Sequence, residues 1–225
     1  MQPANDFRRA ALGVALFLGL SGFAHAGPAE DRALLAAAAH GDAVAVQKLL
    51  DSGAKVDARD GAGRTALLVA THANHVEVAR LLIAAGADVN AKDSIEDSPY
   101  LYAGAEGRND ILKLTLAAGA DLKSTNRYGG TALIPAAHHG HVETVRILLA
   151  TGIDKDHVNR LGWTALLEAV ILGDGGLAHT DIVRQLVAAG SNVNIADRDG
   201  VAPLSHARKR GYAGMVKILK AAGAR

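Results

Sequence analysis

The tripeptide Thr131-Ala132-Leu133 decides the fold, because similar tripeptides recur along the chain at a nearly fixed interval. The corresponding slot reads Thr65-Ala66-Leu67, Ser98-Pro99-Tyr100, Thr131-Ala132-Leu133, Thr164-Ala165-Leu166 and Ala202-Pro203-Leu204. The first residues of these slots are 33, 33, 33 and 38 positions apart. A constant period of this length is typical of proteins built from stacked repeats. We therefore expect a repeat protein in which the threonines of the slots cap helices.

Residues 61–93 contain one complete copy of the repeat. Gly61-Ala62-Gly63 forms a turn, and the hydroxyl of Thr65 is placed to cap a short first helix. A second helix is expected over 76–84, where apolar residues recur at helical spacing. Gly86 ends this helix in the left-handed conformation, and an extended return leads into the next copy.

This copy resembles an ankyrin repeat, on the motifs Thr65-Ala66-Leu67, Val76-Glu77-Val78-Ala79-Arg80-Leu81-Leu82 and Gly86-Ala87-Asp88-Val89-Asn90. The chain has Ala66 where that family usually has Pro, and Leu68 where it usually has His; both departures affect only local capping. The resemblance implies that each unit is a β-turn finger followed by two antiparallel helices. We therefore expect an all-α fold, an α-solenoid of about six ankyrin repeats, with units 1 to 6 at residues 31–60, 61–93, 94–126, 127–159, 160–197 and 198–225.

Three units depart from the regular pattern. In unit 3, Glu96 occupies the usual position of the finger glycine, so we expect a finger that is tilted or mobile. In unit 4, Pro135 lies inside the first helix, where proline is tolerated only near the first turn. Unit 5 carries five extra residues, which the alignment of repeats places at 174–178, between its two helices.

The composition of the 225 residues excludes several classes of function. The formal net charge is +1 with the ten His counted as neutral, so no strong field favours nucleic acid or an anionic membrane. The chain has no Cys, which excludes disulfide bonds, thiolate zinc sites and a Cys nucleophile. Hydrophobic residues make up 49% of the chain and aromatic residues only 4%, a composition that suits thin, closely packed helices.

Residues 1–26 have the pattern of a cleavable signal peptide. Arg8 and Arg9 form a short basic segment, and residues 10–23 are apolar and uncharged. Ala24-His25-Ala26 then places small residues at the two positions that a signal peptidase reads. The apolar stretch is too short to span a bilayer comfortably. We therefore expect export with cleavage after Ala26.

The expected mature chain, residues 27–225, is the ankyrin-repeat domain. The whole chain has 24 basic and 23 acidic residues, and residues 1–26 hold two of the basic and one of the acidic, so the mature chain is balanced at 22 of each. The short signal has a bacterial form, which implies a periplasmic location. We expect a monomer with no membrane association after the signal is removed.

The densest polar cluster is His138-His139-Gly140-His141. Three imidazoles this close are a candidate site for a transition metal or an iron porphyrin, so a metal- or haem-handling protein is one alternative function. No neighbouring carboxylate or Cys completes a ligand set. His141 also follows the inter-helix glycine, where ankyrin repeats often have His. We therefore favour a packing role for the cluster and expect no cofactor.

An enzyme is the second alternative. Nucleophilic catalysis needs a Ser or Thr close to a His and an acid. The threonines of the repeated slots are placed as caps. Ser205 and His206 are adjacent on one helix, which points their side chains apart. We expect no catalytic residues.

The ankyrin resemblance places ligands at the finger tips and on the concave face of the first helices. In units 4 and 5 this predicts partner-binding residues at Arg127, Tyr128, His138, His139, Arg160, Leu161, Trp163, Ile171 and Leu172. Tyr, Trp and Arg dominate binding hot spots; Trp163 either belongs to this surface or packs back against the neighbouring unit. We therefore expect a non-catalytic scaffold that binds another protein. The resemblance to exported bacterial ankyrin proteins implies a periplasmic partner in oxidative defence, such as a catalase.

Overall fold

The computed structural model describes residues 27–225, and the expected signal peptide, residues 1–26, lies outside the described residues. The described chain is all-α, with one isolated bridge between Arg59 and Thr65, as the repeat pattern predicts. Its helices are α1 (Pro28–His40), α2 (Ala43–Asp51), α3 (Ala66–His72), α4 (Val76–Ala84), α5 (Pro99–Ala105), α6 (Asn109–Ala117), α7 (Leu133–His138), α8 (Val142–Leu149), α9 (Ala165–Ile171), α10 (Leu177–Ala188), α11 (Pro203–Lys209) and α12 (Ala213–Ala221).

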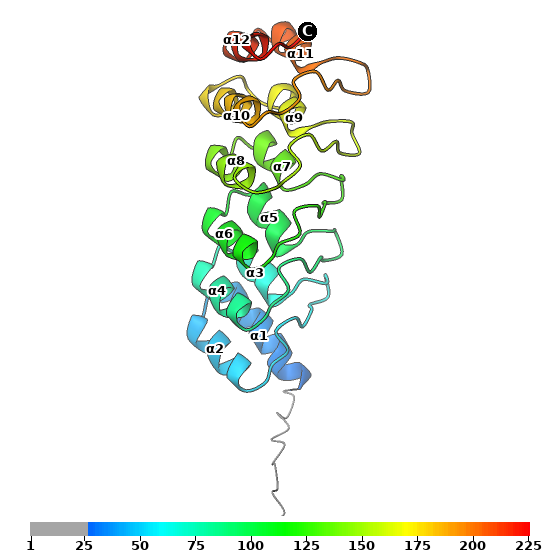
Figure 1. Ribbon diagram of the computed structural model, residues 1–225. Helices are drawn as coiled ribbons and strands as arrows, with labels where there is room; N and C mark the ends of the chain where they lie inside the picture. The colour runs from blue at the N-terminus through cyan, green and yellow to red at the C-terminus, as the bar shows by residue number, and fades with distance from the viewer. Residues whose placement is uncertain (1–26) are drawn as a thin grey trace, which may run out of the picture.

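The helices form two rows in one elongated stack. The first helices of the units, α1, α3, α5, α7, α9 and α11, pack on one another, and the second helices form the row beside them (Figure 1). The fingers project along one edge of the stack, and units 1 and 6 lie at opposite ends (Figure 1). Each unit packs mainly on its neighbours, which leaves a long surface between fingers and first helices.

The last residue of each repeated slot forms one column of the hydrophobic core. These residues are fully buried because each lies on the inner face of a first helix, and they are Leu67, Tyr100, Leu133, Leu166 and Leu204. The second helices add buried residues at helical spacing, such as Val145 and Leu148 of α8. The core therefore runs continuously along the stack.

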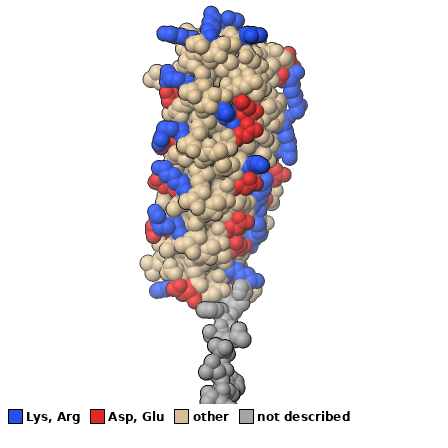
Figure 2. Space-filling model, in the orientation of Figure 1, with Lys and Arg blue, Asp and Glu red and all other residues tan. Residues whose placement is uncertain are grey.

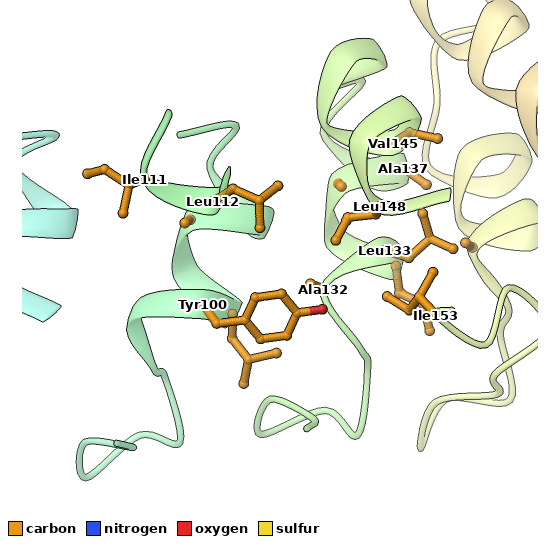
Figure 3. Packing of buried hydrophobic residues seen from close by; sticks show 14 of the residues in the cluster. Tyr100, Ile111, Leu112, Ala132, Leu133, Ala137, Val145, Leu148 and Ile153 are labelled. Atoms are coloured by element: carbon orange, nitrogen blue, oxygen red, sulfur yellow. The ribbon is translucent and has the colours of Figure 1, made fainter. Parts of the chain in front are cut away.

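Tyr100 replaces leucine in this column, and its ring extends from α5 toward unit 4, with the hydroxyl pointing toward Ala132 (Figure 3). The phenol oxygen is buried without a hydrogen-bond partner, and burial raises the pKa of Tyr100. Small residues keep α5 and α7 close beside it. A Cβ placed on Gly104 would lie only 2.8 Å from the Cβ of Ala132.

An Asp or Asn side chain holds each of the five fingers from unit 2 to unit 6. Its Oδ1 accepts backbone N–H groups from the residues two and four positions later, at 2.9–3.0 Å; these residues are Asp60, Asp93, Asn126, Asn159 and Asp197. Glu96 takes the left-handed conformation, with φ 66°, as the glycine position requires. The finger of unit 3 nevertheless keeps both bonds to Asp93, as the other fingers do with their Asp or Asn, and the expected tilt or mobility stays a prediction.

A second set of Asp and Asn side chains links successive units. Each accepts the backbone N–H of a residue in the next unit at 2.8–3.1 Å; the pairs are Asp57–Asp88, Asn90–Asp121, Asp156–Asn192 and Asn194–Arg225. Asp31 accepts the N–H of Lys55 in a similar way within unit 1. Between units 3 and 4 the corresponding residue is Lys123, which has no acceptor oxygen. The bond to the N–H of Asp154 is therefore missing from the series.

The predicted capping role holds for three slots. The hydroxyls of Thr65, Ser98 and Thr164 accept the N–H of the third residue of the following helix at 3.2–3.3 Å. The prediction is wrong for Thr131, whose hydroxyl is buried without a hydrogen-bond partner. The cause is Pro135, which has no N–H to donate to the carbonyl of Thr131.

The insertion in unit 5 and the end of the stack differ from the regular units. The extra residues form the loop at 172–176 and lengthen α10, between the two helices as the alignment predicts. Lys and Arg side chains gather at the end of the stack that unit 6 forms (Figure 2). Within this unit Lys209, Lys217 and Lys220 are exposed. A polar outer face is what a terminal repeat needs. Within residues 27–225, the helices are too short or too polar to cross a membrane.

Candidate functional site

A groove of about 510 Å³ lies where the fingers of units 3 to 5 face the first helices. Its finger side is formed by Ile95, Asp97, Asn126, Arg127, Tyr128, Gly130, Asn159 and Leu161. Its helix side is formed by His72, Tyr102, Ala105, Glu106, Ile134, Pro135, His138, His139, Glu168 and Leu172. The groove crosses four units because the repeats stack in register, so residues about 33 positions apart come side by side.

Three successive fingers place a large apolar side chain at the same position. Ile95, Tyr128 and Leu161 are each 33 residues apart, and their exposed fractions are 50%, 52% and 46%. The corresponding residue is Ala62 in unit 2 and, allowing for the insertion, Asp199 in unit 6. We call Ile95, Tyr128 and Leu161 the finger stripe. The finger stripe is a set of exposed apolar side chains in three consecutive fingers along one groove, and grouped exposed apolar residues are typical of interaction sites.

One ion pair joins the fingers of units 3 and 4. The guanidinium of Arg127 lies 3.9 Å from the carboxylate of Asp97, and its Cζ lies 4.9 Å from the ring centre of Tyr128. Burial, followed by the nearby carboxylate of Asp93, raises the pKa of Asp97. Arg127 therefore neutralises Asp97 and stacks on an aromatic residue of the stripe.

Glu168 is the buried carboxylate of the groove, with only 5% of its surface exposed. It lies on α9, and its Oε1 accepts a hydrogen bond from the Asn159 side chain at 3.1 Å. Its Oε2 lies 3.6 Å from Nδ1 of His138 on the neighbouring helix α7. Burial raises the pKa of Glu168 to about 7, although the bond from Asn159 acts in the opposite direction.

Two histidines of the groove, His72 and His138, favour the neutral form. Burial lowers the pKa of His72 and of His138, and the charge of neighbouring His139 lowers that of His138 further. The ring of His72 stacks on that of Tyr102, with 3.9 Å between their centres, and its Nε2 is buried without a partner. At neutral pH these rings therefore add polar atoms to the groove without adding positive charge.

The comparison with known proteins assigns the family. The model for "Ankyrin repeats (3 copies)" matches residues 12–93 and 100–197, which is more than half of the chain. The chain belongs to the ankyrin-repeat family. A crystal structure of an ankyrin repeat domain from Acinetobacter baumannii AYE is 60% identical, with a TM-score of 0.84, and the match covers 85% of this chain and 98% of that one.

Two further ankyrin proteins are similar over different lengths. The crystal structure of EF0377, an ankyrin repeat protein, is 46% identical with a TM-score of 0.81, over 84% of this chain and 96% of that one. The ankyrin repeat protein YahD of Escherichia coli (strain K12) is 40% identical over 57 residues, which is 25% of this chain and 28% of that protein. Ankyrin repeats generally mediate protein–protein interactions and are non-catalytic.

The groove of this ankyrin-repeat protein contains six of the nine predicted partner-binding residues, namely Arg127, Tyr128, His138, His139, Leu161 and Leu172. The other three, Arg160, Trp163 and Ile171, do not line it. Arg160 instead joins two fingers, since its guanidinium donates to the carbonyl of Arg127 at 2.8 Å. Trp163 and Ile171 are half-buried. A partner-binding role for any of the nine stays a prediction.

Twelve of the eighteen groove residues lie outside the predicted set, among them Ile95, Asp97, Tyr102 and Glu168. Ile95 had a signal, because it shares the 33-residue spacing of Tyr128 and Leu161. No sequence pattern pointed to Asp97, Tyr102 or Glu168, because their exposure is set by residues of neighbouring units.

The three clustered histidines face different surroundings. Nδ1 of His139 bonds to the carbonyl of Ala105 in unit 3 at 2.7 Å. The ring of His141 packs on Gly107, where an added Cβ would lie 3.0 Å from it. Among the residues that the structure describes, no three His, Cys, Asp or Glu side chains are grouped to hold a metal ion. The favoured packing role of this cluster agrees with these contacts.

Proposed function

We propose that this ankyrin-repeat protein is a non-catalytic scaffold that binds another protein in the groove. The observation that carries the proposal is the finger stripe, because three large apolar side chains are about half exposed in consecutive repeats. Leaving such residues in water is unfavourable, and a partner that covers them gains hydrophobic free energy. Tyr128 is the expected anchor, since it combines a large ring with a stacked arginine.

The test is capture of a partner by matched variants. Tyr128→Ala and Leu161→Ala, made together, should abolish capture by the immobilised domain while leaving its thermal unfolding unchanged. Leu177→Ala is the control, because Leu177 is a 92% exposed apolar residue on α10, outside the groove. If the wild-type domain, the Tyr128→Ala/Leu161→Ala variant and Leu177→Ala capture equal amounts of the partner, the placement of the binding surface in the groove is wrong.

We also propose that the protein acts in the periplasm after cleavage of residues 1–26. The basic segment, the apolar stretch and the Ala24-His25-Ala26 site support this location. Mass spectrometry of the protein from a periplasmic extract should give a mature chain that begins at Gly27. A chain with an intact N-terminus in the cytosolic fraction would contradict it.

A catalase or another oxidative-defence enzyme is the specific partner that the resemblance implies, and we propose it as the first protein to test. A purified periplasmic catalase should bind the wild-type domain and lose binding to the Tyr128→Ala/Leu161→Ala variant. Absence of binding would remove this partner and leave the scaffold function to be tested with others.

A further inference from the structure

We propose that the groove selects a segment of its partner that carries a Lys or Arg side chain between apolar residues, and that Glu168 binds this cation. The inference rests on the proposed scaffold function and goes further, because it defines the chemistry of the segment that is bound. Three observations carry it: a buried carboxylate with one oxygen that accepts no hydrogen bond from the described residues, an excess of carboxylates over Lys and Arg in the groove, and apolar side chains on both sides of the groove.

The first observation is the state of the Glu168 carboxylate. Asn159 satisfies one of its oxygens, at 3.1 Å. The other oxygen has only Nδ1 of His138 nearby, at 3.6 Å, which is longer than a hydrogen bond. Glu168 is 95% buried by the protein and yet lines the groove. A buried carboxylate is costly unless it is paired, and a cation that enters the groove can pair with it.

The second observation is the charge balance of the groove. Its carboxylates are Asp97, Glu106 and Glu168, and its one Lys or Arg is Arg127. The guanidinium of Arg127 lies beside Asp97, 3.9 Å from its carboxylate, and over the ring of Tyr128. Burial lowers the pKa of His72 and His138, so these two imidazoles add little positive charge. The charge of His139 also acts on Glu168, but burial outweighs it and the pKa of Glu168 stays raised. The remaining negative charge favours a cationic ligand and disfavours an acidic one.

The third observation is the apolar surface around Glu168. Ile134, Pro135 and Leu172 line the helix side of the groove, as Glu168 does, and Leu161 lines its finger side. The long stem of Lys or Arg packs on such surface while its charged head reaches a polar group. Stacked helices lie about 8–10 Å apart, so the stripe offers apolar contacts at that interval to residues that flank the cation.

The experiment selects peptides with the folded domain itself. A library of short random linear peptides is panned against wild-type protein, the Tyr128→Ala/Leu161→Ala variant and Glu168→Gln. Gln keeps the shape and the acceptor oxygen for Asn159 but removes the charge. Glu143→Gln is the matched control, since Glu143 is an exposed carboxylate on α8, outside the groove.

The expected result is enrichment of Lys or Arg flanked by apolar residues on wild-type protein and on Glu143→Gln. Glu168→Gln should lose that enrichment. A selected peptide should also bind Glu168→Gln about tenfold more weakly than wild type. Replacement of the peptide's arginine by citrulline should weaken its binding to wild type by about the same factor. Thermal unfolding of each variant checks that it is folded.

Two results would overturn the inference, and they are distinguishable. If peptides bind through Tyr128 and Leu161 but show no basic preference, or keep it in Glu168→Gln, the role of Glu168 is wrong and the scaffold function stands. If no captured peptide depends on Tyr128 and Leu161, the groove is not the binding site and the proposed function fails with the inference.

Discussion

Pro135 lies four residues after Thr131, and it changes how the first helix of unit 4 begins. In unit 2 the carbonyl of Thr65 accepts the N–H of Val69 at 3.0 Å, and the hydroxyl accepts that of Leu68. In unit 4 the proline has no N–H. The carbonyl of Thr131 therefore takes the N–H of Ile134 at 3.1 Å, and the hydroxyl is left buried without a partner.

This relationship predicts opposite responses to the same substitution. Thr65→Val removes a capping bond and should lower the free energy of unfolding by about 1 kcal/mol. Thr131→Val removes a buried hydroxyl that makes no bond, and it should be neutral or stabilising by about 1 kcal/mol. Denaturant unfolding of both variants measures the difference. A loss at Thr131 as large as that at Thr65 would mean that the hydroxyl is satisfied in solution.

The missing bond at Lys123 predicts a stabilising substitution. Lys123→Asn places an amide oxygen where Asn90 and Asn194 accept an N–H from the next unit. The new bond to the N–H of Asp154 should raise the free energy of unfolding by about 1 kcal/mol. Asn90→Lys is the matched reverse change and should cost a similar amount. The prediction fails if Lys123→Asn leaves the denaturation midpoint unchanged.

The raised pKa of Glu168 predicts a pH-dependent gain from Glu168→Gln. The folded pKa is about 7 and the ordinary value is 4.5, so between these values the folded protein holds more protons than the unfolded chain. The carboxyl is neutral in both states below pH 4.5, and stability is lost as the pH rises toward 7. Above that range Glu168→Gln should be more stable than wild type by about 3 kcal/mol.

Unfolding curves of wild type and Glu168→Gln at several pH values measure this gain. The difference should be small near pH 4.5 and should grow until it levels off above pH 7. Glu143→Gln serves as the control for removal of a carboxylate that is exposed to solvent. A difference in stability that does not change with pH would show that folding does not raise the pKa of Glu168.

The close approach of α5 and α7 predicts a specific clash. Gly104→Ala adds a methyl group 2.8 Å from the Cβ of Ala132. Overpacking costs about 1–3 kcal/mol, which exceeds the gain of about 1 kcal/mol from better helix propensity. The double variant Gly104→Ala/Ala132→Gly should recover part of the loss, because it restores the space. Additive effects in this double-mutant cycle would contradict direct contact.

Much of the fold could be predicted from the repeat period. The slots and the second-helix motifs predict the all-α solenoid, because each apolar residue recurs at the same place in a unit and must face the same core. The caps at Thr65, Ser98 and Thr164 follow from residue type and position. The hydrogen bonding of Thr131 could not be predicted in this way, because it depends on a proline four residues later in the chain.

The groove could be predicted only in part. The family resemblance places Tyr128, Leu161 and Leu172 on it, and the spacing of Ile95 would have added the third finger. Three predicted residues, Arg160, Trp163 and Ile171, lie in the right units but do not line the groove. Whether a finger side chain lines the groove or contacts its neighbour depends on its direction, which residue type alone does not determine.

The sequence by itself determined the repeat, its period and the residues that form the core, because periodic burial is a property of local pattern. Only the tertiary structure decided that Glu168 is buried beside His138 and that Arg127 neutralises Asp97. These relationships join residues of different units. The physical reason is that burial and charge pairing depend on distances across the stack, which are set when the repeats pack together.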